Sequence, residues 1–104
     1  MKRFSVKVTE PAENDLRDIV RYISARLSVP VTAMKMMETI DEALSDLAYM
    51  PRKHPYVNDD RLAAMGYRKL PIKNYIAFFS IDEKAGIVYV ERILYARRDW
   101  LRIL

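Results

Sequence analysis

The sequence predicts an α+β fold, in which a helix hairpin packs on a largely antiparallel four-stranded sheet in the order β-α-α-β-β-β. Three observations predict this fold. A short alternating segment opens the chain, two long segments with helical apolar spacing follow, and three β-patterned segments separated by short turns fill residues 67–96. The helix hairpin should cover one face of the sheet and leave the other face for function. No repeat or linker divides the chain, so we expect one domain over residues 1–104.

The first strand and the two helices follow from apolar periodicity. Residues 4–8 alternate apolar and polar side chains, which is typical of a half-buried strand. A helix is expected over residues 11–27, because Pro11 suits a first helical turn and apolar residues recur at i, i+3, i+4 and i+7. A short break at residues 28–30 leads to a second helix that ends before Pro51, with methionines as core filler. The short connection predicts an antiparallel pair.

An irregular stretch separates the helices from the remaining strands. Residues 51–66 are rich in Pro, Asn and Asp, and predict a loop with a helical turn over residues 61–65. The strand expected over residues 67–72 contains Pro71, which predicts either a bulge or an edge position because proline cannot donate to a neighbouring strand.

The last two strands form a predicted hairpin. Residues 75–81 are almost continuously apolar, as expected of a central strand covered on both faces. Residues 82–86 suit the turn, and residues 87–96 the final strand. Residues 97–104 end the chain, with a short helical turn.

The positive charge of the chain is concentrated in its C-terminal third. The formal net charge is +4. Residues 1–66 carry ten Lys/Arg and ten Asp/Glu, whereas residues 67–104 carry eight and four. A local excess of this kind suits a polyanion or an acidic protein partner, although ordinary solubility charge also accounts for it.

Composition excludes most common functional sites. The chain has no cysteine and only two glycines, which excludes disulfides, zinc–thiolate sites and a glycine-rich phosphate loop. His54 is expected to be a solvated loop residue, and Asp59-Asp60 a turn or helix cap rather than a metal-binding pair. We therefore expect no metal and no small-molecule cofactor. No signal peptide or membrane-spanning segment is predicted, which favours a cytoplasmic protein without membrane attachment.

Basic and aromatic residues cluster at the ends of two predicted strands. The basic ones are Arg68, Lys69, Lys73, Arg97 and Arg98, and the aromatic ones are Tyr95 and Trp100. We expect the start of the second strand and the end of the last strand to lie at the same end of the sheet, forming one positive site. Such a site could hold phosphates or a carboxylate-rich peptide. The alternative is that Arg97 and Arg98 pair with Asp99, and Trp100 is expected to pack on the core.

Three segments of the chain resemble the RelE/ParE family of bacterial type II toxin–antitoxin toxins, which includes plasmid stabilisation proteins. They are Gly66–Ile72, Asn74–Phe79 and Val88–Trp100, and the opening of the first helix at Pro11-Ala12-Glu13 is also similar. The resemblance covers essentially the whole chain. It implies the fold predicted above, and a growth-inhibiting toxin that a cognate antitoxin protein neutralises.

The family has two main branches, which imply different activities. RelE-like members are ribosome-dependent mRNA endoribonucleases (mRNA interferases). By resemblance, Arg68, Arg97 and Tyr95 would be catalytic, provided that the pKa of Tyr95 falls well below about 10. Lys69, Lys73 and Arg98 would bind phosphate.

ParE-like members instead inhibit DNA gyrase by binding. Here Trp100 and the chain end stand where RelE-like ribonucleases carry a tyrosine, so no general base is evident and the ParE-like interpretation is favoured. The same basic residues would then contact a partner. Whether the chain is an enzyme stays open, and a non-toxic basic binding module is a third alternative.

Overall fold

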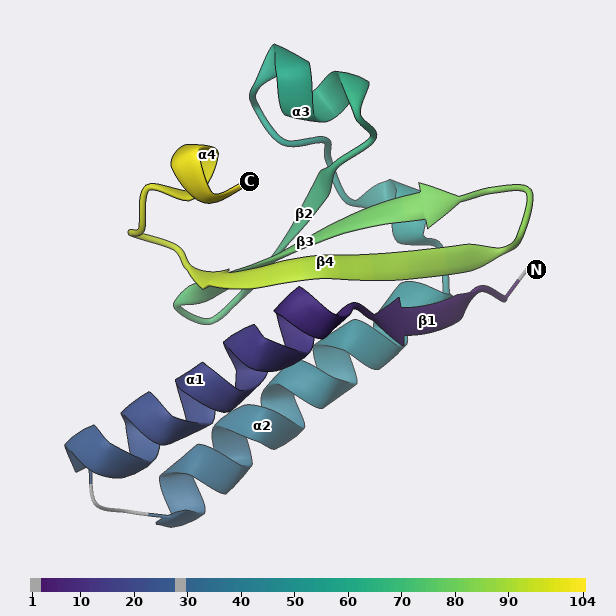
Figure 1. Ribbon diagram of the computed structural model, residues 1–104. Helices are drawn as coiled ribbons and strands as arrows, with labels where there is room; N and C mark the ends of the chain where they lie inside the picture. The colour runs from purple at the N-terminus through teal and green to yellow at the C-terminus, as the bar shows by residue number, and fades with distance from the viewer. Residues whose placement is uncertain (1–2, 28–29) are drawn as a thin grey trace.

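Two long helices form where apolar side chains recur at helical spacing. The computed structural model describes residues 3–27 and 30–104, with α1 at Glu10–Leu27 and α2 at Pro30–Ser45. The predicted break at Ser28 and Val29 lies outside the described residues. The helices run side by side along one face of the sheet (Figure 1), which confirms the predicted hairpin. No helix within the described residues has both the length and the apolar character needed to cross a membrane.

Four strands form one sheet in the order β1-β4-β3-β2. Their bounds are Ser5–Val8 (β1), Arg68–Ile72 (β2), Tyr75–Asp82 (β3) and Ile87–Tyr95 (β4). The strands from β2 to β4 pair antiparallel, and β1 pairs in parallel with β4. The largely antiparallel sheet, the central position of β3 and the edge position of the strand with Pro71 are therefore confirmed.

The main core lies between the helix hairpin and the sheet. Ile19 and Ile23 of α1 and Ile40 of α2 pack against Phe79 and Val90 of the sheet. Each of these five side chains is buried. Burial of a large aliphatic or aromatic side chain contributes roughly 1.5–3 kcal/mol, so this layer fixes the helices on the sheet.

The opposite face of the sheet is not free, contrary to the sequence-based expectation. Phe78 and Leu94 are buried there in a second apolar cluster, beneath the short helices α3 (Asp60–Ala64) and α4 (Trp100–Ile103). A register shift between Phe78 and Phe79 accompanies the placement of these neighbouring rings in different clusters. Because β3 is apolar on both faces, each face needs a cover.

The short helices confirm two smaller predictions. The Asp59 side chain caps α3 by accepting a hydrogen bond from the Leu62 N–H at 2.9 Å, as expected of a helix cap. The Trp100 ring lies 5.2 Å from that of Phe78 and so packs on the core. His54 lies in a loop, as expected, but it is not fully solvated: it is half-buried, with its ring edge-on to that of Phe79 at 5.9 Å.

Candidate partner-binding groove and basic sheet end

The strand register separates residues that the sequence suggested would converge. Arg68, at the start of β2, lies opposite Phe79, whereas Tyr95, at the end of β4, lies opposite Tyr75. Tyr75 in turn pairs with Ile72, at the end of β2. Two consecutive hairpins reverse the chain twice, so β2 and β4 run in the same direction. The start of one and the end of the other therefore lie at opposite ends, and the expected single site was wrong.

Arg68 is engaged by its own chain. Its Nη1 donates to the carbonyl oxygens of Arg52 at 3.2 Å and His54 at 2.7 Å. Its guanidinium stacks 4.0 Å from the ring centroid of Tyr56. The neighbouring Lys69 donates its backbone N–H to the Pro55 carbonyl at 3.1 Å. These contacts hold residues 52–56 along the outer edge of β2, which gives Arg68 a structural role.

The other end of the sheet gathers the remaining predicted basic residues. Lys73 occupies the turn between β2 and β3 with a φ of 54°. The Ala96 N–H donates to the Asn74 carbonyl at 2.8 Å, which ties the segment after β4 to this turn. Lys73, Arg97 and Arg98 are all exposed there. We call these three residues the basic rim.

The guanidinium groups of Arg97 and Arg98 have no side-chain partner among the described residues. Within residues 3–27 and 30–104, neither Arg97 nor Arg98 makes a side-chain hydrogen bond or ion pair. The alternative, a pairing of these arginines with Asp99, is absent from this described part; Asp99 pairs with Arg102 at 3.2 Å. These two exposed arginines are available to an anionic group.

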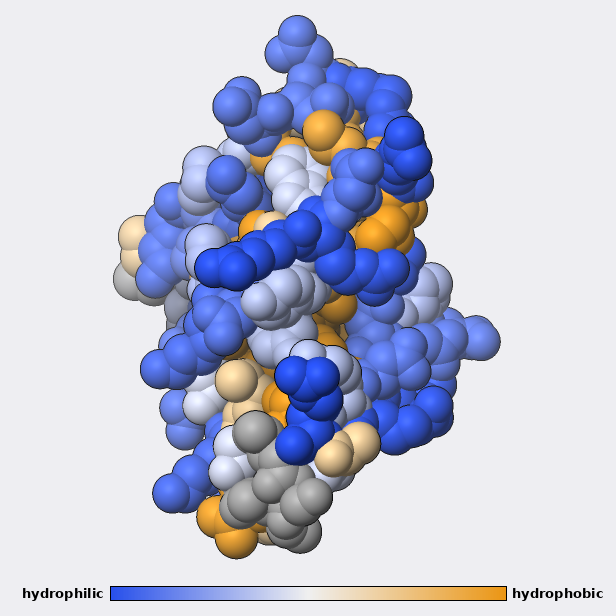
Figure 2. Space-filling view, turned by 90° about the vertical axis from the view of Figure 1, so that its left-hand side faces the viewer, coloured by the Kyte–Doolittle hydropathy of each residue, from blue (hydrophilic) through white to orange (hydrophobic). Residues whose placement is uncertain are grey.

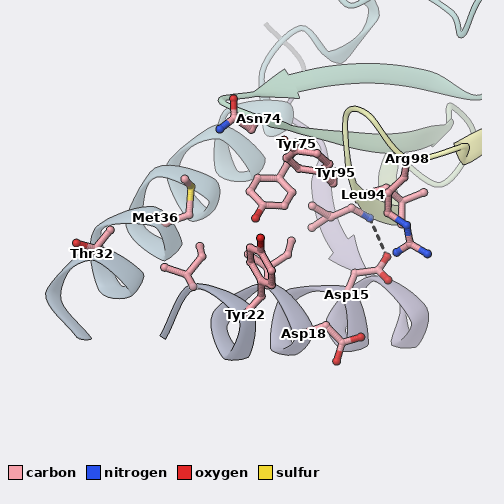
Figure 3. A pocket seen from close by; sticks show the side chains of 13 residues that line it. Asp15, Asp18, Tyr22, Thr32, Met36, Asn74, Tyr75, Leu94, Tyr95 and Arg98 are labelled. Atoms are coloured by element: carbon pink, nitrogen blue, oxygen red, sulfur yellow. Dashed lines mark hydrogen bonds between the residues drawn. The ribbon is translucent and has the colours of Figure 1, made fainter. Parts of the chain in front are cut away.

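Beside the basic rim lies a groove of about 630 Å³ between α1, the start of α2 and the sheet end. Most of its lining is apolar or tyrosine, from Ile19, Tyr22, Ile23, Met36, Tyr75, Ile93, Leu94 and Tyr95. Arg98 and Asp18 also line it (Figure 3). Figure 2 shows this face: apolar and weakly polar residues are visible along its middle, between hydrophilic side chains that cross and border it.

Three tyrosines give the groove its character. Tyr22 is 58% exposed and Tyr95 39%, whereas Tyr75 is only 8% exposed. The rings of Tyr75 and Tyr95 pack edge to face at 5.8 Å, and the hydroxyls of Tyr22 and Tyr75 point toward one another (Figure 3). Burial, followed by the nearby Tyr22 and Tyr95, raises the pKa of Tyr75. Its phenol therefore stays protonated at neutral pH and is suited to hydrogen bonding.

The Asp15 side chain fixes one wall of the groove, because it accepts a hydrogen bond from the β4 edge where none of the described strands does. β1 ends opposite Val90, and β4 continues beyond it with an open edge. There Asp15 of α1 accepts the Ile93 N–H at 2.9 Å and both Nε and Nη2 of Arg92, at 2.8 and 2.9 Å. The hydrogen bond to Asp15 raises the pKa of Arg92. These contacts hold α1 at a set distance from the end of β4, which keeps the groove open.

The predicted proton-transfer residue and the histidine lie at opposite ends of the sheet. His54, whose pKa is lowered by burial and then by Lys53 and Arg68, packs on Phe79, level with the start of β2. The groove lies at the other end of the sheet. Tyr95 is the predicted proton-transfer residue that reaches the groove, with Arg98 beside it.

Sequence reasoning missed Tyr22, Tyr75 and Asp15 as groove residues. Tyr22 and Asp15 looked like ordinary helix positions, and Tyr75 like part of an apolar strand. The sequence contains a partial signal for the tyrosines, because a tyrosine in an otherwise apolar stripe usually places its hydroxyl at a polar or solvent-exposed edge. Only the register of β3 and β4 against α1 brings the three side chains together.

Comparison with protein-family models gives a match over residues 6–100 to the model described as the ParE toxin of the type II toxin–antitoxin system, parDE. The chain belongs to the ParE toxin family. This confirms the family-level resemblance.

Two solved structures have the same fold as this ParE-family toxin. One is the chromosomal ParDE toxin–antitoxin system from P. aeruginosa, with a TM-score of 0.76 and 20% identity over 93% of this chain and 100% of that one. The other is the RelBE2 toxin–antitoxin complex from Mycobacterium tuberculosis, with a TM-score of 0.61 and 19% identity over 89% and 98%. The comparison with curated proteins gives no match.

Proposed function

We propose that this ParE-family protein is a growth-inhibiting toxin that acts in the cytoplasm by binding DNA gyrase. The observation that supports binding over catalysis is the distribution of polar groups. The sheet face opposite the helix hairpin carries the Phe78–Leu94 cluster rather than a polar cleft. Arg68, the predicted catalytic arginine on β2, is engaged with the carbonyls of residues 52 and 54. A binding poison needs neither a general base nor a cleft of this kind.

The basic rim is the proposed contact with the target. Lys73, Arg97 and Arg98 are exposed beside one another at the end of the sheet that Arg68 does not reach. Arginine forms bidentate hydrogen bonds with carboxylates, so an acidic protein surface fits this rim.

A cognate antitoxin is the proposed natural inhibitor. The two solved structures named above are toxin–antitoxin systems. The groove has an apolar and aromatic surface beside the basic rim. An amphipathic antitoxin segment with acidic residues at one end would fit this surface. Occupation of the groove would cover Arg98 and so block the rim.

The deciding experiment is controlled expression in bacteria, with gyrase-dependent DNA breaks and mRNA ends mapped in the same cells. DNA breaks with intact mRNA are expected. They should be lost on Arg97→Glu, and retained on Lys84→Glu, which changes the charge equally in the distant turn after β3.

A ribosome-dependent endoribonuclease is the second candidate, because Tyr95 lies two residues from Arg97 at an exposed strand end. New mRNA ends within translated codons, without DNA breaks, would establish that activity instead. They should then disappear on Tyr95→Phe, which removes only the hydroxyl that would carry the proton.

A further inference from the structure

The groove contains a polar feature that a purely apolar occupant would leave unsatisfied. Tyr75 is only 8% exposed, yet its hydroxyl faces that of Tyr22 across the groove (Figure 3). Within the described part of the chain, neither hydroxyl makes a hydrogen bond. A segment that covered the pair with apolar atoms would remove both hydroxyls from water without replacement, which costs affinity.

We propose that the Tyr22–Tyr75 hydroxyl pair and Arg98 are specificity determinants of the groove, and that they select the antitoxin segment. The proposal rests on the proposed role of the groove as the antitoxin site. The segment would be apolar on its groove-facing side except at two places. One is a hydrogen-bonding side chain opposite the hydroxyl pair, and the other is an acidic side chain at Arg98.

The spacing of the two places follows from α1. Figure 3 shows Asp15 near Arg98 at one end of the groove, and Tyr22 follows seven residues later on α1. With a rise of 1.5 Å per residue, Tyr22 is about 10 Å from Asp15 along the helix axis. The hydrogen-bonding and acidic side chains of the occupant should therefore be separated by roughly two helical turns, or three extended residues.

The charges around Arg98 favour an acidic rather than a basic side chain. Asp15 is compensated by Arg92 and the Ile93 N–H. Asp18, with a side chain 74% exposed, forms an exposed ion pair with Arg21 at 3.7 Å. Arg98 has no such partner among the described residues, and Lys73 and Arg97 add positive charge beside it. After these ion pairs are taken into account, the electrostatic potential at this end of the groove is positive.

The test uses a phage-displayed library of random 20-residue segments, selected on the whole toxin. Segments that bind the groove are identified because they no longer bind Thr32→Trp, a variant that fills the groove from an exposed position on α2. Their sequences are expected to share an acidic residue and a hydrogen-bonding residue at the spacing given above.

Binding of these segments to single variants then measures each determinant. Tyr75→Phe and Tyr22→Phe each remove one hydroxyl, and each should weaken binding about tenfold, and Arg98→Gln at least tenfold. Tyr89→Phe, outside the groove, is the matched control and should leave binding unchanged. Replacing the acidic residue of the segment by Gln should abolish the effect of Arg98→Gln, as in a double-mutant cycle.

The outcomes separate this proposal from the one it rests on. Groove-binding segments that lack the shared polar positions would overturn the specificity determinants and leave the groove as a docking site. The same follows if the segments bind Tyr75→Phe and Arg98→Gln as tightly as they bind the unmodified toxin. If every selected segment still binds Thr32→Trp, the groove is not a docking site and both proposals fail. Melting temperatures of the variants show that each remains folded.

Discussion

At the scale of single residues, a few polar contacts decide how the apolar layers are held. Asp15 is the clearest case, because one carboxylate supplies acceptors to the Arg92 guanidinium and to a backbone N–H of an open strand edge. Arg68 holds a neighbouring segment at the β2 edge of the sheet, by donating to two carbonyl oxygens. A residue that a family resemblance suggests as functional, such as Arg68, can thus have a structural role instead.

The Asp15 contact should carry a large part of the stability of the chain. Asp15→Ala would leave Arg92 without its partner and the Ile93 N–H without an acceptor, and should lower the free energy of unfolding by about 2–4 kcal/mol. Denaturant unfolding measures this. Asp18→Ala, one turn along the same helix, removes an exposed ion pair and should cost less than about 0.5 kcal/mol. Equal losses in both variants would contradict the role given to Asp15.

His54 should make stability depend on pH in a defined window. Burial lowers its pKa from the ordinary value of 6.5, so the unfolded chain binds a proton more readily than the folded chain. Stability is therefore retained above about pH 6.5 and lost as the pH falls from there toward the lower folded pKa. His54→Gln should remove this contribution. A comparison of unfolding free energies at pH 8 and pH 5 tests it, and an identical loss in both proteins would rule it out.

At the scale of elements, the segment over residues 52–56 depends on Arg68. Arg68→Ala should release it from β2, because two hydrogen bonds and a ring stack are lost. The Val57 and Lys69 amides, which bond across this edge, should then exchange with solvent about 10–100-fold faster. Lys69→Ala, at the next position, should leave exchange nearly unchanged. Unaltered exchange in Arg68→Ala would show that other contacts hold the segment.

The elements themselves were largely predictable from the sequence, whereas their mutual placement was not. Helical spacing in α1 and the unbroken apolar run of β3 are local signals, and both were interpreted correctly. The strand that contains Pro71 was assigned either a bulge or an edge position for a local reason as well. The position of Arg68 depends on strand direction across two hairpins, and the groove depends on how Tyr22, Tyr75 and Tyr95 meet from three elements. No local pattern encodes these relations.

At the scale of the whole molecule, the distribution of charge matters more than its total. The net charge of +4 comes from residues 67–104, and the fold places much of it at one end of the sheet, in the basic rim. The acidic residues of α2, such as Glu38 and Asp41, lie on another surface of the molecule. An acidic partner should therefore approach the end that holds the rim and the groove.

The association rate with the antitoxin tests this asymmetry. Arg97→Glu and Lys84→Glu change the net charge equally, but Arg97 follows the end of β4 whereas Lys84 lies in the turn before its start. At low salt, Arg97→Glu should slow association about tenfold and Lys84→Glu less than twofold, because the field that steers an acidic partner is local to the rim. Both differences should shrink near 1 M salt, where the Debye length falls to about 3 Å. If the two variants slow association equally, net charge rather than its placement steers the partner.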